Sequence, residues 1–249
     1  MNIMKDFHGK VAFIQGGSRG IGAAIVKRLA QEGAAVAFTY RSSRNEAQQL
    51  VDELNITGCN VIAIHADSAD PQALQQAVRH AAKHFGGLDI LVNNAGILPW
   101  GALEEMTLAE IDLALAVNVR AVIIASQEAI LHMGVGGRII NIGSVNADRI
   151  PIAGGAVYAM TKASLVGFTK GLARDLGPSK ITVNTVQPGP IDTDMNPADG
   201  EVASQLKQLM ALRRYGKSEE VASFVAYLAG PEAGFITGAS LNIDGGFAA

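Results

Sequence analysis

Short apolar runs alternate with longer amphipathic segments along this chain, and this alternation limits the folds open to it. We predict seven strands, over residues 11–15, 35–40, 61–66, 90–92, 138–142, 182–187 and 240–243. Most of them are apolar throughout and rich in β-branched residues, which is typical of parallel strands buried on both faces. The segments between them have helical periodicity. The sequence therefore predicts a doubly wound α/β fold, with helices on both faces of a parallel sheet.

Three of the intervening segments begin with signals for a helix start. The residue pairs are Ser43 with Glu46, Asp70 with Pro71, and Thr107 with Glu110. The first and third have the spacing of a capping box, and the second offers an N-cap followed by proline. No Pro/Ser-rich linker and no internal repeat divides the chain, so we expect residues 1–249 to form one domain. We interpret the turn-rich stretch 188–200 as a mobile segment over a site.

Composition excludes several classes of protein. The 249 residues include 20 Lys and Arg against 23 Asp and Glu, without a basic run, which disfavours a nucleic-acid partner. The single cysteine, Cys59, rules out an internal disulfide framework and a CxxC metal site, so we expect a cytoplasmic protein. His80 and His84 lack a third metal ligand. We expect no signal peptide, membrane span or membrane partner.

A glycine-rich loop follows the first predicted strand. Gly16, Gly20 and Gly22 let the backbone turn tightly and approach a ligand, and the next helix presents free N–H groups to an anion. The spacing GxxxGxG differs from the general dinucleotide fingerprint GxGxxG. A turn without a ligand is the alternative, but the position after the first strand favours a phosphate site. Asn93, at the end of the fourth strand, is interpreted as a structural residue.

Ser144, Tyr158 and Lys162 form a possible acid–base site. Ser144 follows the fifth predicted strand, and Tyr158 and Lys162 are four residues apart on a predicted helix, so they share a face. A nearby ammonium group lowers the pKa of a tyrosine, which could then exchange a proton with a substrate oxygen while the serine polarises that oxygen. An amphipathic helix with a surface lysine is the alternative interpretation.

Taken together, these motifs closely resemble the short-chain dehydrogenase/reductase family. The resemblance covers residues 10–247. It rests on the glycine loop, Asn93-Asn94-Ala95-Gly96, Asn118, Ser144, Tyr158 with Lys162, and Pro188-Gly189-Pro190. It implies a Rossmann-like three-layer sandwich with a seven-stranded parallel sheet, a nicotinamide cofactor, and a small carbonyl or alcohol substrate. It also implies a homotetramer, which the apolar segment 234–249 supports.

The resemblance assigns roles to individual residues. Tyr158 is the general acid/base, Ser144 orients the carbonyl, Lys162 holds the ribose and lowers the tyrosine pKa, and Asn118 holds a water. The cofactor-binding residues that we expect are Gly16, Ser18, Arg19, Gly20, Ile21, Gly22, Tyr40, Arg41, Ser42, Asp67, Ser68, Asn94, Ala95, Gly96, Tyr158, Lys162, Pro188, Gly189, Ile191 and Thr193. One departure from the family pattern is Gln15, where threonine is usual, and it puts the hydrogen bonds of the turn in doubt.

The end of the second predicted strand favours NADP(H) over NAD(H). Arg41 stands there, followed by Ser42 and Ser43, and no acidic residue precedes Glu46. An acidic residue would bind the ribose 2′-hydroxyl of NAD, whereas a guanidinium suits the 2′-phosphate of NADP. We expect Arg19 to approach the same phosphate from the glycine loop. The alternative is that both arginines are merely solvent-exposed.

The substrate is less well defined by the sequence. We expect Ser144, Asn146, Tyr158, Trp100 and Met195 to line its pocket, which would suit a bulky or aryl ketone, although Trp100 could equally pack in a subunit contact. The main hypothesis is an NADPH-dependent carbonyl reductase. Segments 143–149 and 186–194 resemble a cyclic-di-GMP-binding member of the family, so a regulator of that kind is the alternative. A third hypothesis is a 3-oxoacyl-carrier-protein reductase.

Overall fold

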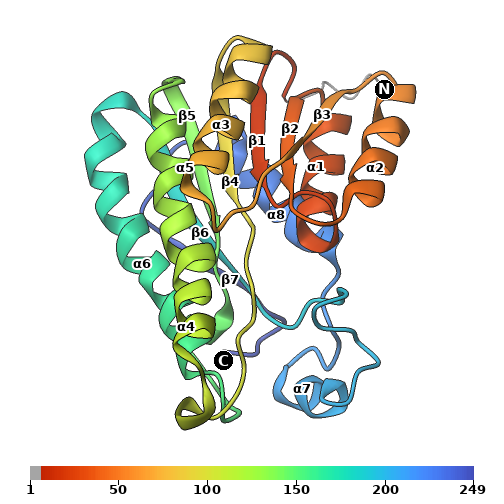
Figure 1. The fold of residues 1–249 in the computed structure, drawn as a ribbon, viewed down its shortest axis with the longest axis vertical. Helices are drawn as coiled ribbons and strands as arrows, with labels where there is room; N and C mark the ends of the chain where they lie inside the picture. Colours follow the sequence, from red (N-terminus) through yellow and green to blue (C-terminus); the bar gives the residue numbers. More distant parts are fainter. Residues whose placement is uncertain (1–6) are drawn as a thin grey trace.

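A seven-stranded, all-parallel sheet forms the centre of the molecule. The computed structural model describes residues 7–249, and the strand order is β3-β2-β1-β4-β5-β6-β7 (Figure 1). The strands are β1 (Val11–Gln15), β2 (Ala35–Tyr40), β3 (Asn60–His65), β4 (Leu88–Asn93), β5 (Met133–Ile142), β6 (Thr182–Pro188) and β7 (Ser240–Ile243). The order reverses direction between β1 and β4, the neighbouring strands at the centre of the sheet. The predicted doubly wound parallel sheet is confirmed.

Helices cover both faces of this sheet. The α-helices are α1 (Gly20–Gln31), α2 (Arg44–Ile56), α3 (Pro71–Phe85), α4 (Leu108–Leu115), α5 (Ala121–Ile130), α6 (Ala156–Leu176), α7 (Ala203–Leu209) and α8 (Ser218–Ala229). One core lies between the sheet and α1, α2 and α8, and a second lies between the sheet and α3, α5 and α6. Short helical turns span 103–105, 116–120, 145–147, 177–179 and 231–233.

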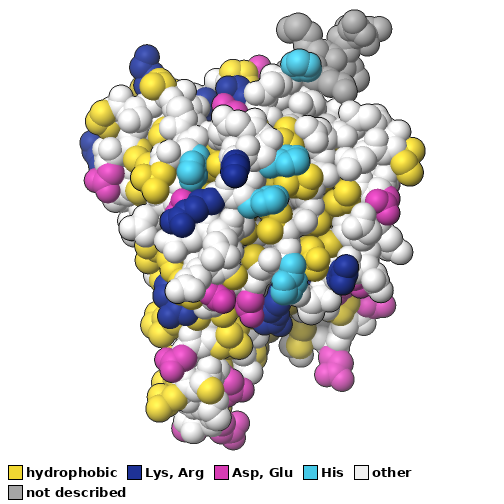
Figure 2. All heavy atoms as spheres, turned by 45° about the horizontal axis from the view of Figure 1, so that its top comes forward, with side chains coloured by type: hydrophobic (Ala, Val, Ile, Leu, Met, Phe, Trp, Pro, Cys, Tyr) yellow, Lys and Arg dark blue, Asp and Glu magenta, His cyan; other side chains and the backbone are white. Residues whose placement is uncertain are grey.

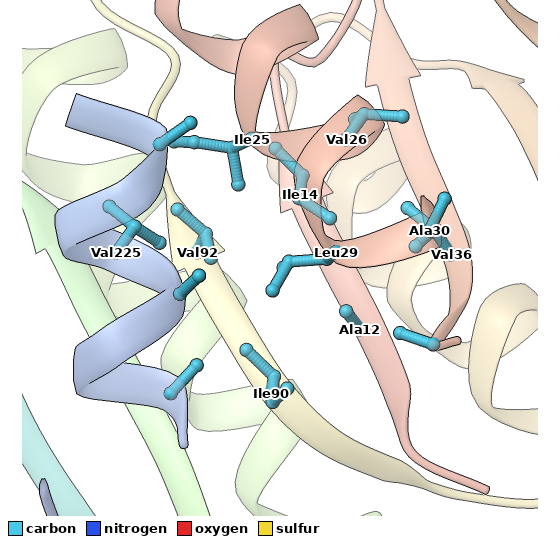
Figure 3. Packing of buried hydrophobic residues seen from close by; sticks show 14 of the residues in the cluster. Ala12, Ile14, Ile25, Val26, Leu29, Ala30, Val36, Ile90, Val92 and Val225 are labelled. Carbon is cyan, nitrogen blue, oxygen red and sulfur yellow. The ribbon is translucent and has the colours of Figure 1, made fainter. Parts of the chain in front are cut away.

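The first core shows why the strands are apolar on both faces. Ile25 and Leu29 are one helical turn apart on α1 and point at Ile14 and Val92 of the sheet, with Val225 of α8 beside them (Figure 3). All five side chains are fully buried. Full burial of one aliphatic side chain contributes about 1.5–3 kcal/mol. Because α1 packs closely on the sheet, the position of the glycine loop directly before it is fixed as well.

All three predicted helix starts are confirmed, and two of them have the predicted cap. The Asp70 carboxylate accepts hydrogen bonds from the N–H groups of residues 72 and 73, and Thr107 and Glu110 form a reciprocal capping box. The box predicted at Ser43 is wrong, because the Ser43 side chain makes no capping hydrogen bond. Instead, the Arg44 N–H donates to the Ser42 carbonyl at 3.0 Å, with Ser43 at φ −87° and ψ 62°. This inverse γ-turn sets Ser43 outside capping geometry.

Charged groups of both signs are interspersed on the outer surface. Figure 2 brings forward the end of the molecule opposite α7, where histidine, basic and acidic side chains lie among apolar ones. His80 and His84 of α3 stack on each other, with ring centroids 6.2 Å apart. Within residues 7–249, no cluster of three His, Cys, Asp or Glu residues could hold a metal ion. No helix in that range is both long and apolar enough to cross a bilayer.

Candidate functional site

A cavity of about 720 Å³ lies at the carboxyl ends of the strands. Its walls come from the segments at the ends of β1 to β7, so parts of the chain far apart in sequence meet there. Doubly wound sheets bind ligands at this edge, where the strand order reverses. All of the predicted cofactor and substrate-pocket residues line this cavity, and of the predicted site residues only Asn118 does not.

The glycine loop is held in place by contacts that a side chain would disrupt. Gly16 has φ +73°, and a Cβ atom there would stand 2.9 Å from the Cα atom of Ala95. A Cβ atom on Gly22 would stand 2.1 Å from the Gly16 oxygen. The Asn94 side-chain amide donates to that oxygen at 2.7 Å. The loop therefore needs glycine to bring its backbone against the segment after β4.

The hydrogen bond left in doubt at Gln15 is supplied from another strand. The Gly16 N–H donates to the Thr39 hydroxyl of β2 at 2.9 Å. Gln15 is fully buried, and neither polar atom of its side chain has a partner among the described residues. Strand β2 thus supplies a threonine that supports the turn. Sequence inspection missed this residue because the pairing of β1 and β2 brings it close.

The cavity suits a dinucleotide at its glycine-rich end. Helix α1 begins there, and no side chain caps its first N–H groups, which leaves them available to an anion. Arg19 and Arg41 both line the cavity, and neither makes an ion pair or a side-chain hydrogen bond with another residue of the described range. Two cations without an anionic partner fit the additional phosphate of NADP(H).

Tyr158, Lys162 and Ser144 lie together in the lining of the cavity. Tyr158 and Lys162 lie one turn apart on α6, with the Lys162 Nζ atom 5.9 Å from the centroid of the tyrosine ring. Lys162 Nζ donates to the Ile142 carbonyl at 2.9 Å, which anchors it to the end of β5. The Ser144 hydroxyl accepts from the Asn146 N–H at 3.1 Å and still has its own proton to donate.

Burial changes the acidity of both groups on α6. It lowers the pKa of Lys162 to about 8 and raises the pKa of Tyr158, while a hydrogen bond from Ser144 acts in the opposite direction on the tyrosine. The net shift of the tyrosine pKa is upward because burial dominates, and the lowering expected from Lys162 stays a prediction. The phenolate would lose its surrounding water on burial, and this penalty is the largest cause of the shift. Tyr158 is therefore a protonated phenol near neutral pH.

Asn118 lies behind the cavity wall, where it holds a loop. It is fully buried in a short π-helical turn, Ala116–Arg120. Its side chain accepts from the N–H of Ile97 at 2.9 Å and donates to the carbonyl of the same residue at 2.9 Å. It also donates to the Thr161 hydroxyl of α6 at 3.1 Å. Asn118 thus connects the segment after β4 to the helix that carries Tyr158.

Asn93 has the structural role expected of it. It is buried at the end of β4, and its amide donates to Ser126 of α5 at 3.1 Å and to Asn141 of β5 at 2.8 Å. Asn141 in turn donates to Thr169 of α6. These bonds run beneath the site and fix the positions of two strands and two helices.

Apolar side chains contribute a large part of the cavity lining. Trp100 and Met195, both expected there, are joined by side chains from several segments. The further apolar residues are Ile97, Leu98, Ile152, Val202, Leu206 and Phe247. No local motif marks Ile152, Val202, Leu206 or Phe247 in the sequence as pocket residues. Phe247 is brought in by the last turn of the chain, where it packs with Val145, Met210 and Tyr215.

Known proteins resemble this chain over almost all of its length. The family model described as Enoyl-(Acyl carrier protein) reductase matches residues 16–248. The cyclic-di-GMP-binding biofilm dispersal mediator protein of Escherichia coli strain K12 is 52% identical over 99% of this chain and 100% of that protein.

Solved structures agree with this result. A short-chain dehydrogenase/reductase from Serratia marcescens is 67% identical, with a TM-score of 0.97, over 98% of this chain and 100% of that one. A short-chain dehydrogenase from Burkholderia cenocepacia, solved in complex with NADP, is 56% identical with the same TM-score and the same coverage.

Proposed function

Because the chain belongs to the short-chain dehydrogenase/reductase family and is an NADP-dependent oxidoreductase, we propose that it reduces the carbonyl group of a small ketone, or oxidises the corresponding alcohol. The observation that carries this proposal is that Ser144, Tyr158 and Lys162 lie together in the lining of the cavity. A regulator that only sequesters a nucleotide has no need of a tyrosine beside a buried lysine.

NADPH, when bound, supplies the hydride for the carbonyl carbon. Tyr158 gives its proton to the carbonyl oxygen, and its raised pKa keeps that proton in place near neutral pH. The Ser144 hydroxyl donates a hydrogen bond to the same oxygen and stabilises the charge that develops on it. Lys162 lies beside the tyrosine and, with a pKa of about 8, is mostly protonated at neutral pH. Its charge stabilises the phenolate that remains after proton transfer.

The residues predicted for the cofactor divide between its two ends. In our proposal, the glycine loop and the start of α1 hold the pyrophosphate, and Arg19 and Arg41 hold the 2′-phosphate. Asp67 lies near the adenine, and Thr193 contacts the nicotinamide amide. Each of these residues lines the cavity. Asn118 acts by holding Ile97 and the loop around it.

A second candidate function is supported by the relative from E. coli. Its name describes a cyclic-di-GMP-binding protein, and this chain is 52% identical to it. The two arginines of the cavity could equally meet the phosphates of a cyclic dinucleotide. Such a ligand would compete with NADPH for the same end of the cavity.

One experiment separates these two functions. Purified protein is mixed with NADPH and a panel of ketones, diketones and 3-oxo esters, and NADPH consumption is followed, with Tyr158→Phe as the control. We expect turnover by the wild type and almost none by the variant. No turnover above background, together with tight binding of cyclic-di-GMP that NADPH displaces, would favour the regulator instead.

We also propose that the chain functions as a single domain, in a cytoplasmic homotetramer. Exposed aromatic residues near the end of the chain support the assembly, since the Phe235 side chain is fully exposed and Tyr227 of α8 is 44% exposed. A free cysteine, Cys59, is compatible with the reducing cytoplasm. Light scattering at micromolar concentration tests the assembly, and a monomeric mass would refute it.

A further inference from the structure

Trp100 is fixed to the backbone that leads into the catalytic helix. Its indole N–H donates to the Ala153 carbonyl at 2.9 Å. The next residue, Gly101, donates its N–H to the Gly154 carbonyl at 3.1 Å. These two bonds join the segment after β4 to the segment before α6, on which Tyr158 is three residues beyond Gly155.

Two glycines leave room for the indole ring. A Cβ atom on Gly155 would stand 2.7 Å from the Cη2 atom of Trp100, and one on Gly154 would stand 2.8 Å from its Nε1 atom. The ring therefore lies along this bare stretch of backbone. Because the ring lines the cavity and remains 42% exposed, part of its surface is free for a ligand.

The charges in this half of the cavity limit what can enter. Among the described residues, the charged side chains that segments 97–100, 151–152 and 193–206 contribute to the lining are Asp194 and Glu201, both acidic. No lysine or arginine from these segments could receive a carboxylate or a phosphate. A phosphopantetheine arm, which carries a phosphate, would meet two negative charges there.

From these observations we infer that Trp100 is a specificity-determining residue, which makes the site selective for aryl ketones without negative charge. This inference rests on the proposed ketone reduction. The aryl group packs against the indole, and the carbonyl reaches Ser144 and Tyr158. Aromatic pairs gain about 0.5–1.5 kcal/mol beyond their buried area, which corresponds to about 2- to 13-fold in binding. A carrier-protein thioester is accordingly a poor substrate.

The test compares acetophenone with cyclohexyl methyl ketone, which has a similar shape without an aromatic ring. We expect Trp100→Ala to lower kcat/KM for acetophenone by about 10-fold, mainly through KM, and to change the value for the cyclohexyl ketone by about 3-fold or less. In the wild type, acetylbenzoate, the carboxylated analogue of acetophenone, should be a much poorer substrate. NADPH affinity should be unchanged.

Two further variants test whether the effect of Trp100→Ala comes from the indole ring itself and not from a general disturbance of this segment. Gly155→Ala keeps the tryptophan but places a methyl group against its ring, and its φ of −92° suits alanine, so selectivity should fall in the same direction. Leu103→Ala is the control, because Leu103 lies on the same segment outside the cavity and is 59% exposed. Equal losses for both ketones in Trp100→Ala, or none for acetophenone, would overturn the inference.

A binding measurement separates this inference from the proposed function. Trp100 is the only tryptophan of the 249 residues, so its fluorescence reports on this wall directly. With NADP⁺ present, which cannot reduce a ketone, acetophenone should change the emission saturably and at lower concentration than cyclohexyl methyl ketone. Such binding without any turnover with NADPH would refute the proposed ketone reduction. It would still support the inference that Trp100 binds aryl groups. Equal affinities for the two ketones would refute the inferred selectivity of Trp100 for aryl groups.

Discussion

Tyr158 and Lys162 lie one helical turn apart on α6. Burial raises the pKa of the tyrosine and lowers the pKa of the lysine, so it favours the uncharged form of both. Tyrosine keeps its proton more firmly, and lysine releases its proton more readily. For ketone reduction the phenol must give a proton, and Lys162, with a pKa of about 8, is still mostly protonated at neutral pH and can stabilise the anion left behind. The residues were predictable from their spacing, but the direction of the tyrosine shift was not, since it depends on burial.

The first prediction separates the proton donor from the hydrogen-bond donor. Tyr158→Phe should remove nearly all turnover and leave NADPH binding intact, because only the transferable proton is lost. Ser144→Ala should lower kcat by about 10²–10³, as expected for the loss of one donor to a developing oxyanion. Steady-state kinetics and NADPH titration measure both effects. A Tyr158→Phe enzyme with near wild-type turnover would contradict the mechanism.

The second prediction concerns the stability cost of Lys162. Its pKa in the folded protein, about 8, lies below the ordinary value of 10.5, so between these two pH values the unfolded state binds more protons than the native state. Stability of the wild type should therefore rise with pH across that window, as the cost of the buried charge is relieved.

Lys162→Met removes this buried charge and tests the cost directly. At neutral pH the variant should be inactive and melt a few degrees higher than the wild type, because the desolvation penalty is gone. Melting curves of both proteins without cofactor, at about pH 7 and about pH 10, measure the difference. A difference that does not narrow at the higher pH would contradict the assigned pKa shift.

The third prediction concerns the choice of cofactor. Arg41→Asp should weaken NADPH binding by about 1.5–3 kcal/mol, the value of a charged hydrogen bond, with repulsion in addition. NADH binding should weaken much less, because NADH has no 2′-phosphate. Fluorescence titrations with both cofactors measure the ratio. Equal kcat/KM for NADH and NADPH in the wild type would already contradict the proposal that Arg19 and Arg41 bind the 2′-phosphate.

At the scale of whole helices and strands, the sequence was informative where local rules decide the structure. The ranges predicted for β1, β2 and β7 match the structure, and β3 is shifted by one residue. Strand β5 begins at Met133, five residues before the predicted start, because the irregular stretch 133–137 pairs with β4 across a bulge at Leu88–Ile90. Pairing of that kind depends on the partner strand, so no local apolar pattern indicates it.

The π-helical turn between α4 and α5 shows the same limit. Its sequence, Ala116–Arg120, differs little from ordinary helix, yet the wider turn presents Asn118 to the backbone of Ile97. Such turns are rare and often occur at functional sites. The resemblance to a family identified Asn118, but only the structure shows that its side chain holds the backbone of Ile97 in the loop after β4.

The fourth prediction tests the hydrogen bonds between Asn118 and Ile97. Asn118→Leu keeps a similar side-chain volume but leaves the N–H and C=O groups of Ile97 without their partners, which should cost about 1–3 kcal/mol of stability. The amide of Ile97 should exchange hydrogen faster, and kcat/KM should fall because the loop carrying Trp100 is released. Hydrogen-exchange mass spectrometry over residues 94–103 measures the release. Unchanged exchange there would mean that the loop is held by other contacts.

At the scale of the whole molecule, the cavity draws its walls from almost the full chain, from Gly16 to Phe247. The part of the cavity proposed for the cofactor was predictable as a lining, because each of its motifs lies at a strand terminus. The substrate end was predictable only in part, since segments that are distant in sequence meet there through packing. Phe247, for example, has no motif of its own, and its position depends on Arg149.

Arg149 fastens the last residues of the chain to the loop after β5. Its guanidinium donates to the backbone oxygen of Phe247 and, at 3.5 Å, to that of Ala249, and it lies 5.8 Å from the centroid of the Phe247 ring. Phe247 is 2% exposed and lines the cavity. One arginine thereby couples the loop that carries Ser144 to the final turn of the chain.

The fifth prediction follows from this coupling. Arg149→Ala should free the Phe247 ring, raise KM for ketones several-fold and leave the affinity for NADPH unchanged, because the residues proposed to hold the cofactor belong to other segments of the cavity lining. Arg149→Lys should recover only part of the effect, since an ammonium group lacks the planar fork of donors. Kinetics combined with hydrogen exchange over residues 244–249 measure both consequences. An unchanged KM despite faster exchange of that segment would show that Phe247 does not shape the substrate pocket.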